Sequence, residues 1–388
     1  MVHYSDFAID SRVQRQARAL AERGHDVHCV CLTAPERIVV GGGAIRLHSI
    51  GARKMRGSVA GYVFGYARFF VAAFRRVSAL ERLHRLDVVE THNMPNFLAF
   101  TALVPKLRGA RVVLDIHDTF PELFETKFDV GSRHGAARAI RVEERMSVAF
   151  ADRTIAVTEE ARQRVSDRCP RGNVDWVVMN SPDEEVFGPR RAPVRIPAEG
   201  PLRVVYHGGT AKRFGVLELI RAVGLLEESS PEIWLDVYGA DDESRALAAL
   251  ARQVAPGRVH VAPRPVPFEE IPSELEGAHI GVVPTLDDPF TKLLLPVKLL
   301  EYVHLGIPVV TSRLPVIERY FSAEEVRFFE SGDPASIAAA IQDIRRHPDE
   351  AMARAERAST RLQDIEWRGQ RAAYIGQIEA LAALRTAA

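Results

Sequence analysis

The sequence predicts an α/β protein built from two doubly wound parallel sheets. Strand-like apolar runs alternate with helical patterns along the whole chain, which is typical of parallel sheets with crossover helices. The length of 388 residues is long for one hydrophobic core and favours two domains. Val186–Pro201 is rich in Pro, Gly and Arg and has no periodicity, so it is the predicted linker.

Six strands are expected before the linker and six after it. The first series is Val27–Leu32, Ile45–Ser49, Asp87–Thr91, Arg111–Ile116, Thr154–Val157 and Trp176–Met179. The second series is Leu202–Tyr206, Ile233–Tyr238, Val259–Val261, Ile280–Val283, Val309–Thr311 and Val326–Phe329. Met1–Tyr4 is at best the tail of a first strand, which indicates a trimmed or misassigned start.

Helices are expected between these strands and at the C-terminus. Examples are Ser11–Arg23, Gly215–Glu228 and Ser336–Arg346. Thr360–Arg385 is predicted to be one long amphipathic helix. The expected domains are residues 1–188 on the acceptor side, a linker at 189–200, and a donor domain at 201–360. Residues 361–388 would be a helix returning toward the first domain.

Composition excludes several classes of protein. Basic and acidic residues balance at 51 each, so nothing points to nucleic acid. The three cysteines have no metal-ligand spacing, and a reducing cytoplasm is the expected compartment. No apolar run is long enough to span a membrane, and no signal peptide is visible.

Four polar loops begin where a predicted strand ends. They start at His92, His117, His207 and Pro284. Ligands of open α/β sheets bind at the carboxyl ends of strands, so these loops predict a cleft between the two domains. The cleft residues expected from the first domain are His92, Asn93, His117, Asp118 and Glu122.

The loop His207-Gly-Gly-Thr210 resembles a phosphate-binding loop in character. It matches neither a Walker A sequence nor the GxGxxG fingerprint. Gly208 and Gly209 would let the backbone approach a ligand, and Lys212 and Arg213 would neutralise a diphosphate. An ordinary strand–helix turn with solvated basic residues is the alternative.

His117 and Asp118 could bind a sugar hydroxyl at the end of their strand. Glu122 would share a face with Asp118 if this segment were helical. The alternative is a capping aspartate followed by a surface glutamate. The spacing of His92, His117, Asp118 and Glu122 does not favour a metal.

Leu295–Val310 predicts a loop, a helix and a buried strand. Pro296 suits the first helical turn, and Gly306 suits the C′ position. The helix N-terminus and Lys298 would attract an anion, while Glu301 could accept a hydrogen bond from a sugar hydroxyl. Together these features suit a nucleotide diphosphate.

Residues 53–85 mix arginines with aromatic side chains. Such a helix can lie in a membrane interface. It can also be a core helix whose arginines extend to solvent. Both interpretations stay open, so peripheral membrane contact is one prediction for this segment.

The chain resembles the family-four retaining glycosyltransferases of GT-B fold over nearly its whole length. The segments that carry the resemblance are Asp10–Val27, Leu114–Asp118, Met179–Pro182 with Phe187, His207–Gly215 and Leu295–Pro308. The resemblance implies two Rossmann-like domains facing a central cleft. It also implies that His117 lies near the donor sugar, that Lys212 and Arg213 hold the diphosphate, and that Glu301 holds the ribose.

The chain departs from the family pattern in two places. The family has two glutamates separated by seven residues, but Leu293 stands eight positions before Glu301. Either Asp287, Asp288 or Thr291 takes over the sugar contacts, or the chain recognises its donor differently. The glycine-rich first loop, which commonly borders the acceptor, is replaced by Ser5–Asp10.

The resemblance implies transfer of a sugar from a nucleotide-diphosphate sugar to a hydroxyl acceptor, with retention of configuration. The acceptor would be a glycan, a lipid-linked intermediate or a small molecule. No cofactor or metal is expected. The location would be cytoplasmic, with peripheral contact at the inner membrane face as an option. The residues expected to be catalytic are His117, Lys212 and Arg213. Those expected to bind the donor are Gly208, Gly209, Thr210, Asp288, Thr291, Leu295, Pro296, Lys298 and Glu301. Those expected on the acceptor side are Asp10, His92, Asn93, Asp118 and Glu122.

Three alternatives remain from the sequence. A nucleotide-sugar epimerase of the same fold would need no acceptor. A glycogen- or trehalose-type phosphorylase would need inorganic phosphate or pyridoxal phosphate, and no lysine motif for the latter is evident. A non-catalytic nucleotide-sugar-binding partner protein is the third, and Leu293 is the best argument for it.

Overall fold

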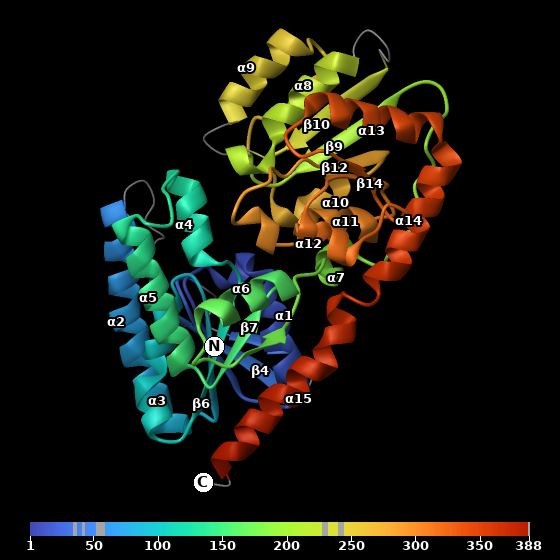
Figure 1. Cartoon of the computed structure of the whole chain (residues 1–388). Coiled ribbons are helices and arrows are strands. Elements are labelled where there is room, and N and C mark those ends of the chain that lie inside the picture. Colours follow the sequence, from blue (N-terminus) through green and yellow to red (C-terminus); the bar gives the residue numbers. More distant parts are fainter. Residues whose placement is uncertain (34–36, 41–42, 52–58, 227–231, 240–243, 387–388) are drawn as a thin grey trace. The chain divides into compact units, whose positions relative to one another are not determined.

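Two compact units make up the chain in this computed structural model (Figure 1). Unit 1 contains Met1–Met179 and Arg368–Ala388, and unit 2 contains Asn180–Trp367. The structure describes residues 1–33, 37–40, 43–51, 59–226, 232–239 and 244–386. The segment expected as a linker joins unit 2, since the backbone N–H groups of Arg191 and Val194 donate to the carbonyls of His304 and Gly306.

Unit 1 is built on a sheet whose strands run in the order β3-β4-β2-β1-β5-β6-β7-β8. Every pairing is parallel except that of β3 with β4. The strands are β1 Val2–His3, β2 Val27–Cys31, β3 Arg37–Val40, β4 Gly43–Ser49, β5 Val88–His92, β6 Arg111–Ile116, β7 Arg153–Ala156 and β8 Val174–Val177. Val112, Val113, Leu114 and Ile116 of β6 are fully buried, as expected for a strand covered on both faces.

Helices cover both faces of this sheet (Figure 1). Side chains of α2, α5 and α6 share one core cluster with η2, while α1 lies against β2 and β4. The helices of unit 1 are η1 Phe7–Ile9, α1 Ser11–Glu22, α2 Val59–His84, η2 Asn96–Ala102, α3 Leu103–Leu107, α4 Phe120–Phe128, α5 Gly135–Phe150, α6 Glu159–Arg168 and α15 Trp367–Thr386.

Unit 2 has a six-stranded parallel sheet in the order β11-β10-β9-β12-β13-β14. The strands are β9 Leu202–His207, β10 Ile233–Tyr238, β11 Val259–Val261, β12 Ile280–Val283, β13 Val309–Ser312 and β14 Arg327–Phe329. Both sheets with their helices form Rossmann-like α/β layers, as the sequence predicted.

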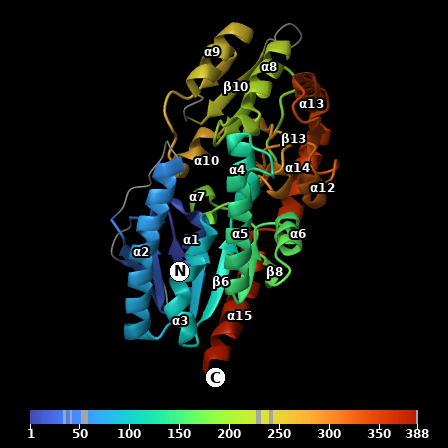
Figure 2. The ribbon, with the colours of Figure 1, turned by 60° about the vertical axis from the view of Figure 1, so that its left-hand side comes forward.

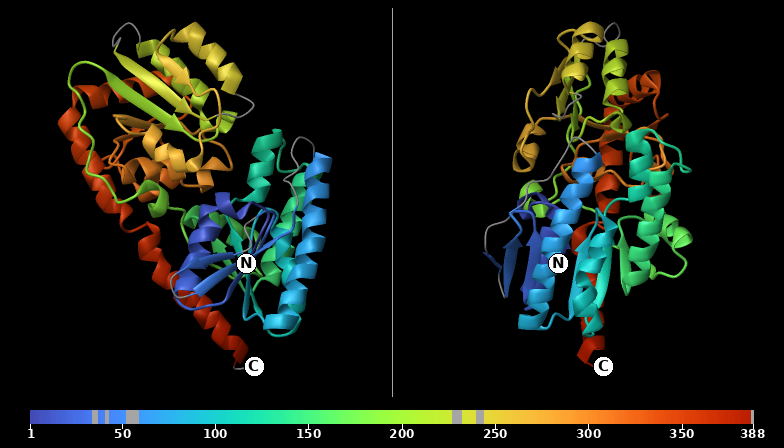
Figure 3. Two further views of the ribbon diagram at one scale, coloured as in Figure 1. Left: turned by 180° about the vertical axis from the view of Figure 1, so that it is seen from behind. Right: turned by 90° about the vertical axis from the view of Figure 1, so that its left-hand side faces the viewer.

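Helices also cover both faces of the unit 2 sheet (Figure 3). Helices α8, α9 and α13 pack against one another on one face, and α11 packs on β12 and β13. The helices are α7 Glu184–Phe187, η3 Lys212–Phe214, α8 Val216–Leu226, α9 Ser244–Val254, η4 Phe268–Glu270, α10 Ile271–Glu274, η5 Thr291–Leu293, α11 Val297–His304, α12 Pro315–Tyr320, α13 Pro334–Arg346 and α14 Pro348–Leu362.

Each sheet contains one point where the strand order reverses. In unit 1 the chain moves from β1 to β2 on one side and reaches β5 on the other. In unit 2 the same reversal separates β9 from β12. The connections leave opposite faces of the sheet at such a point, which opens a crevice at the carboxyl ends of the two strands.

Most predicted strands are confirmed, and Arg111–Ile116, Ile233–Tyr238, Val259–Val261 and Ile280–Val283 have the expected bounds. The prediction of one helix over Thr360–Arg385 is wrong, because α14 ends at Leu362 and α15 begins at Trp367. Pro296 occupies the N-cap position of α11 rather than its first turn. Strand β3 was not predicted, and Met1–Tyr4 supplies β1, which pairs with both β2 and β5.

Helix α15 is fastened to unit 1 by buried groups. Tyr374 is buried, and its hydroxyl donates to Oε2 of Glu90 on β5 over 2.6 Å. Its ring stacks on Trp176 with centroids 6.3 Å apart. Burial and the charge of Asp115 raise the pKa of Glu90 to about 7. Within the described residues, none of the helices combines the length and apolarity that crossing a membrane requires.

Replacing Tyr374 with Phe should destabilise the protein in a pH-dependent way. The hydroxyl bond favours the ionised form of Glu90, so its loss should matter more above pH 7 than below it. We expect a loss of about 1–3 kcal/mol at pH 8 and a smaller loss at pH 6, measured by urea denaturation. An equal loss at both pH values would show that Glu90 does not titrate as described.

Candidate active site

The loop that follows β9 lies at the strand-order reversal of unit 2. Gly208 has a φ of 107°, a conformation that favours glycine. A Cβ atom on Gly208 would lie 3.1 Å from Nζ of Lys298, and one on Gly239 would collide with the Gly208 carbonyl oxygen. The backbone is therefore packed tightly against a lysine on α11, the helix that follows the next strand of the sheet.

Lys298 is held over aromatic rings beside this loop. Its Nζ donates to the hydroxyl of Tyr206 over 2.6 Å and lies 4.0 Å from the centre of that ring. The ring of Phe214 is 4.8 Å away. Burial lowers the pKa of Lys298 to about 7, and the charge of Glu301 only partly offsets this. An anion bound here would favour the charged amine.

Glu301 forms a buried pair with His207. Nε2 of His207 lies 2.6 Å from Oε2 of Glu301, and both residues are about 5% exposed. The backbone N–H of His207 donates to the Tyr302 hydroxyl over 3.1 Å. Nδ1 of His207 is buried and has no hydrogen-bond partner among the described residues. The strand-end position of His207 was visible in the sequence, but its pairing with Glu301 was not.

Arg213 is placed by aromatic packing, whereas Lys212 is exposed. The Arg213 guanidinium carbon lies 5.4 Å from the ring centre of Phe214 and 5.8 Å from that of Phe290. Its backbone carbonyl accepts from the N–H of Leu286 in the loop after β12. The two loops flanking the strand-order reversal are thus joined at Arg213.

Asp288 and Thr291 shape the second of these loops. Oδ1 of Asp288 accepts from the backbone N–H groups of Phe290 and Thr291 over 2.7 and 2.8 Å. The Thr291 hydroxyl donates to the Leu286 carbonyl over 2.6 Å. Asp287 pairs with Lys292 at 2.9 Å. The three residues proposed to replace the missing glutamate are therefore engaged within their own loop.

The other residues expected to bind the sugar donor lie near these loops in the sequence, but their side chains differ in exposure. Thr210 and Leu295 are buried, while Pro296 is half-buried. Leu293, which stands in place of the family's first glutamate, is also half-buried. No side chain caps the N-terminus of α11. The backbone around Pro296 therefore offers the polar groups of this helix end to a ligand.

Unit 1 has a cavity of about 760 Å³ at its own strand-order reversal. Asp10, Asn93, His117 and Asp118 line it. Asn93 holds the loop after β6, because its Oδ1 accepts from the His117 N–H over 2.8 Å and its Nδ2 donates to the Asp118 carbonyl over 2.7 Å. Asn93, His117 and Asp118, which were predicted from strand ends, are thus brought together with Asp10, which was expected on the acceptor side.

Asp10 is anchored at the rim of this cavity. Oδ1 accepts from the N–H of Val13 and caps α1, and Oδ2 accepts from the Ser5 hydroxyl over 2.8 Å. Burial raises the pKa of Asp10, but the His3 hydrogen bond and neighbouring imidazole charges outweigh it and lower the pKa overall. Asp10 is therefore a carboxylate at neutral pH.

Behind His117 lies a buried charged network. Arg12 donates from Nε and Nη2 to both oxygens of Asp115, each over 2.8 Å. Nδ1 of His92 is 3.1 Å from Nε2 of His117 and 3.4 Å from Oδ2 of Asp115. Burial lowers the pKa of His92 to about 4, so its ring is neutral. His92 and Asp115 position His117 from behind rather than facing the cavity.

Glu122 lies away from the cavity, contrary to its expected place on the acceptor side. Its carboxylate is 2% exposed and accepts from Arg164 over 2.8 Å and from Arg168 over 2.6 Å. Helix α4 begins at Phe120, so Asp118 precedes the helix and cannot share a face with Glu122. The carboxylate has a structural role in joining α4 to α6.

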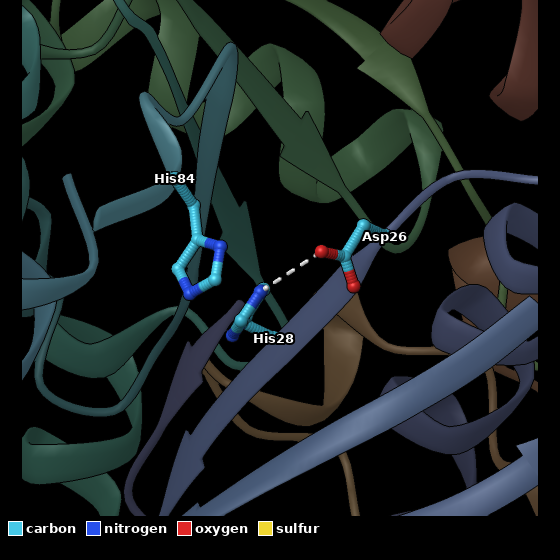
Figure 4. Close-up of side chains that lie close together, drawn as sticks. All are labelled: Asp26, His28 and His84. Atoms are coloured by element: carbon cyan, nitrogen blue, oxygen red, sulfur yellow. Dashed lines mark hydrogen bonds and ion pairs between the residues drawn. The ribbon is translucent and has the colours of Figure 1, made fainter.

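Two clusters in the described residues have ligand atoms close enough to hold a metal ion. They are His92, Asp115 and His117, and Asp26, His28 and His84 (Figure 4). In the first, Arg12 occupies both oxygens of Asp115. In the second, Arg46 pairs with both oxygens of Asp26. Each carboxylate is thus shared with a guanidinium, and each cluster is part of an ion-pair network.

Known families match most of the chain. The model described as Glycosyltransferase Family 4 matches residues 10–178, and that described as Glycosyl transferases group 1 matches residues 201–347. The chain is a family-four-type glycosyltransferase. The first matched range covers most of unit 1, and the second covers most of unit 2.

A curated relative is also named as a glycosyltransferase. TuaH of Bacillus subtilis (strain 168), named as a teichuronic acid biosynthesis glycosyltransferase, is 24% identical over 193 residues. The alignment spans 48% of this chain and 47% of TuaH. The present chain therefore matches about half the length of that curated relative.

Solved structures show the fold. Sucrose-phosphate synthase from Thermosynechococcus elongatus has a TM-score of 0.73 at 18% identity, covering 100% of this glycosyltransferase and 99% of that chain. Anabaena HepE in complex with UDP has a TM-score of 0.66 at 13% identity, covering 98% of both chains. HepE has also been solved with UDP-glucose. These likenesses identify the GT-B fold.

Proposed function

We propose that this glycosyltransferase moves a sugar from a nucleotide-diphosphate sugar to a hydroxyl acceptor, with retention of configuration. One observation carries the donor assignment: the Gly208 backbone, Lys298 and the His207–Glu301 pair meet at the carboxyl end of β9. The UDP and UDP-glucose complexes of the HepE fold relative support a nucleotide donor. Those complexes also make UDP-glucose the first probe.

The proposed diphosphate site combines a glycine backbone, which has no side chain to block a ligand, with positive charge. The donor's phosphates would approach Gly208 and Gly209, with Lys298 and the N-terminus of α11 providing positive potential. Arg213 and Lys212 would add charge at the leaving phosphate. Negative charge grows there as the glycosidic bond breaks, so these groups stabilise the transition state more than the ground state.

Glu301 is proposed to bind the nucleotide ribose. Nε2 of His207 lies 2.6 Å from Oε2 of Glu301, and this contact fixes the carboxylate in place. The other oxygen is then oriented for ribose hydroxyls. A prepositioned carboxylate loses little freedom on binding, which is the advantage of building it on a helix.

In the reaction, the bond from the sugar anomeric carbon to the diphosphate oxygen breaks. The acceptor oxygen bonds to the same carbon on the same face, and its proton passes to the departing diphosphate. His117 is proposed to orient the sugar, and Asp10 the acceptor hydroxyl. No metal or cofactor is part of this proposal.

The location we propose is the cytoplasm. The buried thiols of Cys29, Cys31 and Cys169 are free, which suits a reducing compartment.

The basic and aromatic segment that includes α2 was given two interpretations, a membrane-interface helix and a core helix. In α2, Phe69, Ala73 and Val77 are buried while Arg68, Arg75 and Arg76 are exposed, which matches the core-helix interpretation. Residues 53–58 of the basic segment lie outside the described residues, and Tyr62 has no described side chain.

An NMR time course can test the activity. With UDP-glucose and neutral glycoside acceptors, we expect UDP release and a new glucoside whose anomeric proton has the α configuration of the donor. Without acceptor, the sugar of UDP-glucose should keep its identity. A β-linked product would contradict retention. Conversion of UDP-glucose into another UDP-sugar would instead identify an epimerase.

Arg213→Ala should lower kcat at saturating donor by about 10²-fold, as loss of a transition-state donor does in other enzymes. Arg221→Ala, on the exposed side of α8, is the control and should behave like the wild type. Steady-state UDP release measures both. Wild-type turnover in the Arg213 variant would remove Arg213 from the reaction.

Donor affinity should fall as pH rises above about 7, because the pKa of Lys298 is lowered to about 7 and the diphosphate requires its charged form. The loss approaches ten-fold per pH unit at most, since one proton is taken up on binding. Calorimetric titration of UDP-glucose from pH 6 to 8.5 measures it. Lys298→Arg should flatten this dependence, because arginine stays charged.

If the wild type and Lys298→Arg show the same pH dependence, Lys298 does not provide the titrating charge. Using the diphosphate diester UDP-glucose rather than UDP avoids a terminal phosphate that titrates in the same range. The comparison therefore isolates the lysine.

A further inference from the structure

The cavity of unit 1 has a polar end and a larger apolar body. Its apolar walls come from α2, α4, α5 and the segment after β5. The ribbons of these three helices are labelled in Figure 2. Aromatic rings dominate these walls, namely Tyr66, Phe97, Phe120, Phe124 and Phe128. A volume of about 760 Å³ lies within the usual range for pockets that enclose a small organic ligand.

The polar end is the proposed reaction end. Asp10, Asn93, His117 and Asp118 line the cavity from the carboxyl ends of β1, β5 and β6. A hydroxyl placed at Asp10 and His117 would therefore have the rest of its molecule directed along the aromatic walls. A free sugar would leave those walls uncovered.

One polar group lies among the apolar walls. Glu143 of α5 lines the cavity, and its Oε2 accepts from Asn96 over 2.9 Å. Its Oε1 is buried and has no hydrogen-bond partner among the described residues. Glu143 therefore adds a half-buried acidic group to the wall of the cavity.

The charges around the cavity disfavour an anionic ligand. The acidic lining groups are Asp10, Asp118 and Glu143, and Lys127 at the exposed end of α4 is the basic one apart from histidines. Burial raises the pKa of Glu143 to about 7, so this carboxyl is partly neutral at neutral pH. A phosphate inside the cavity would still meet the carboxylate of Asp10.

The apolar lining continues to the surface. Val63 of α2 is 61% exposed and Phe128 of α4 is 40% exposed, and both line the cavity. Phe64, next to Val63, is 60% exposed. Exposed apolar residues at the mouth allow a ligand longer than the cavity to extend outward without leaving apolar surface.

We propose that this cavity binds the acceptor, and that the acceptor is a neutral amphiphile: a hydroxyl, free or on one sugar, attached to a large apolar group. The hydroxyl lies at Asp10 and His117, and the apolar group lies between α2, α4 and α5. This proposal rests on the proposed transferase function and adds the chemical class of its acceptor. Both a lipid and an aromatic aglycone have this chemistry.

Direct binding to the full-length protein without donor tests the proposal. Methyl, hexyl and octyl glucosides are titrated below their micelle concentrations, with phenyl glucoside as the aromatic arm and glucose 6-phosphate as the anionic arm. For alkyl chains we expect affinity to rise about four-fold for each added methylene, which corresponds to about 0.8 kcal/mol. Glucose 6-phosphate should not bind measurably.

The two apolar arms distinguish the sources. A steep rise along the alkyl series with weak phenyl glucoside binding identifies a lipid acceptor. Tighter binding of phenyl than of octyl glucoside identifies an aromatic aglycone. Equal affinity of methyl and octyl glucoside, or preferential binding of glucose 6-phosphate, would overturn the proposal.

A variant pair on α5 places the binding in this cavity. Ala139 lines the cavity, whereas Val142 is 52% exposed and does not. Ala139→Trp should weaken octyl or phenyl glucoside binding by at least ten-fold, and Val142→Trp should leave it unchanged. Equal effects of the two variants would contradict the assignment.

Binding of UDP-glucose by the same variants separates this proposal from the proposed function. Unchanged UDP-glucose affinity in Ala139→Trp shows that the variant is folded and that its donor site is intact. If UDP-glucose binds but no glucoside does, the acceptor class is wrong and the transferase proposal stands. If the glucosides bind and UDP-glucose does not, the donor assignment is wrong.

Discussion

The reversal of strand order in each parallel sheet is the constraint on which the candidate site depends. From β1 and from β9, the following strands are added first on one side and later on the other side of the sheet. Because the crossovers are right-handed, those on the two sides must pass on opposite faces of the sheet. No helix can then cover the carboxyl end between β1 and β5, or between β9 and β12. The candidate site residues of this chain gather at these two ends, where ligands of open α/β sheets bind.

Both ends use a histidine beside a carboxylate, but in different ways. His207 is locked directly to Glu301, which orients a carboxylate for a ligand. His117 faces a cavity while His92 and the Arg12–Asp115 pair lie behind it. The first arrangement orients the Glu301 carboxylate as a hydrogen-bond acceptor. The second holds the imidazole ring of His117 in place. In each case the buried charge is paired, which avoids the cost of an isolated charge.

Much of this organisation could be predicted from the sequence. The β-branched runs at Arg111–Ile116 and Ile280–Val283 were sufficient for strands, and polar residues after them marked the site. Gly306 ends α11 at a φ of 71°, as its position before Pro308 indicated. What failed depends on tertiary partners. Glu122 looked like a site residue until Arg168, 46 positions away, paired with it.

Other features were beyond local patterns for the same reason. The break between α14 and α15 was not visible in the sequence, because Gln363–Glu366 contains neither proline nor glycine. The pairing of His207 with Glu301 joins residues 94 positions apart. The cavity of unit 1 is assembled from separate segments between His3 and Glu143, so its apolar character is a property of the fold rather than of one motif.

Hydrogen–deuterium exchange with and without UDP-glucose tests the central claim most directly, namely that unit 2 binds the nucleotide sugar at the end of β9. The account predicts slower exchange at His207–Gly215 and in the first turn of α11, centred on Lys298 and Glu301. It predicts no comparable protection on the far strands β11 and β14. Binding of UDP-glucose without protection of these two segments, or protection confined to other parts of the chain, would contradict it.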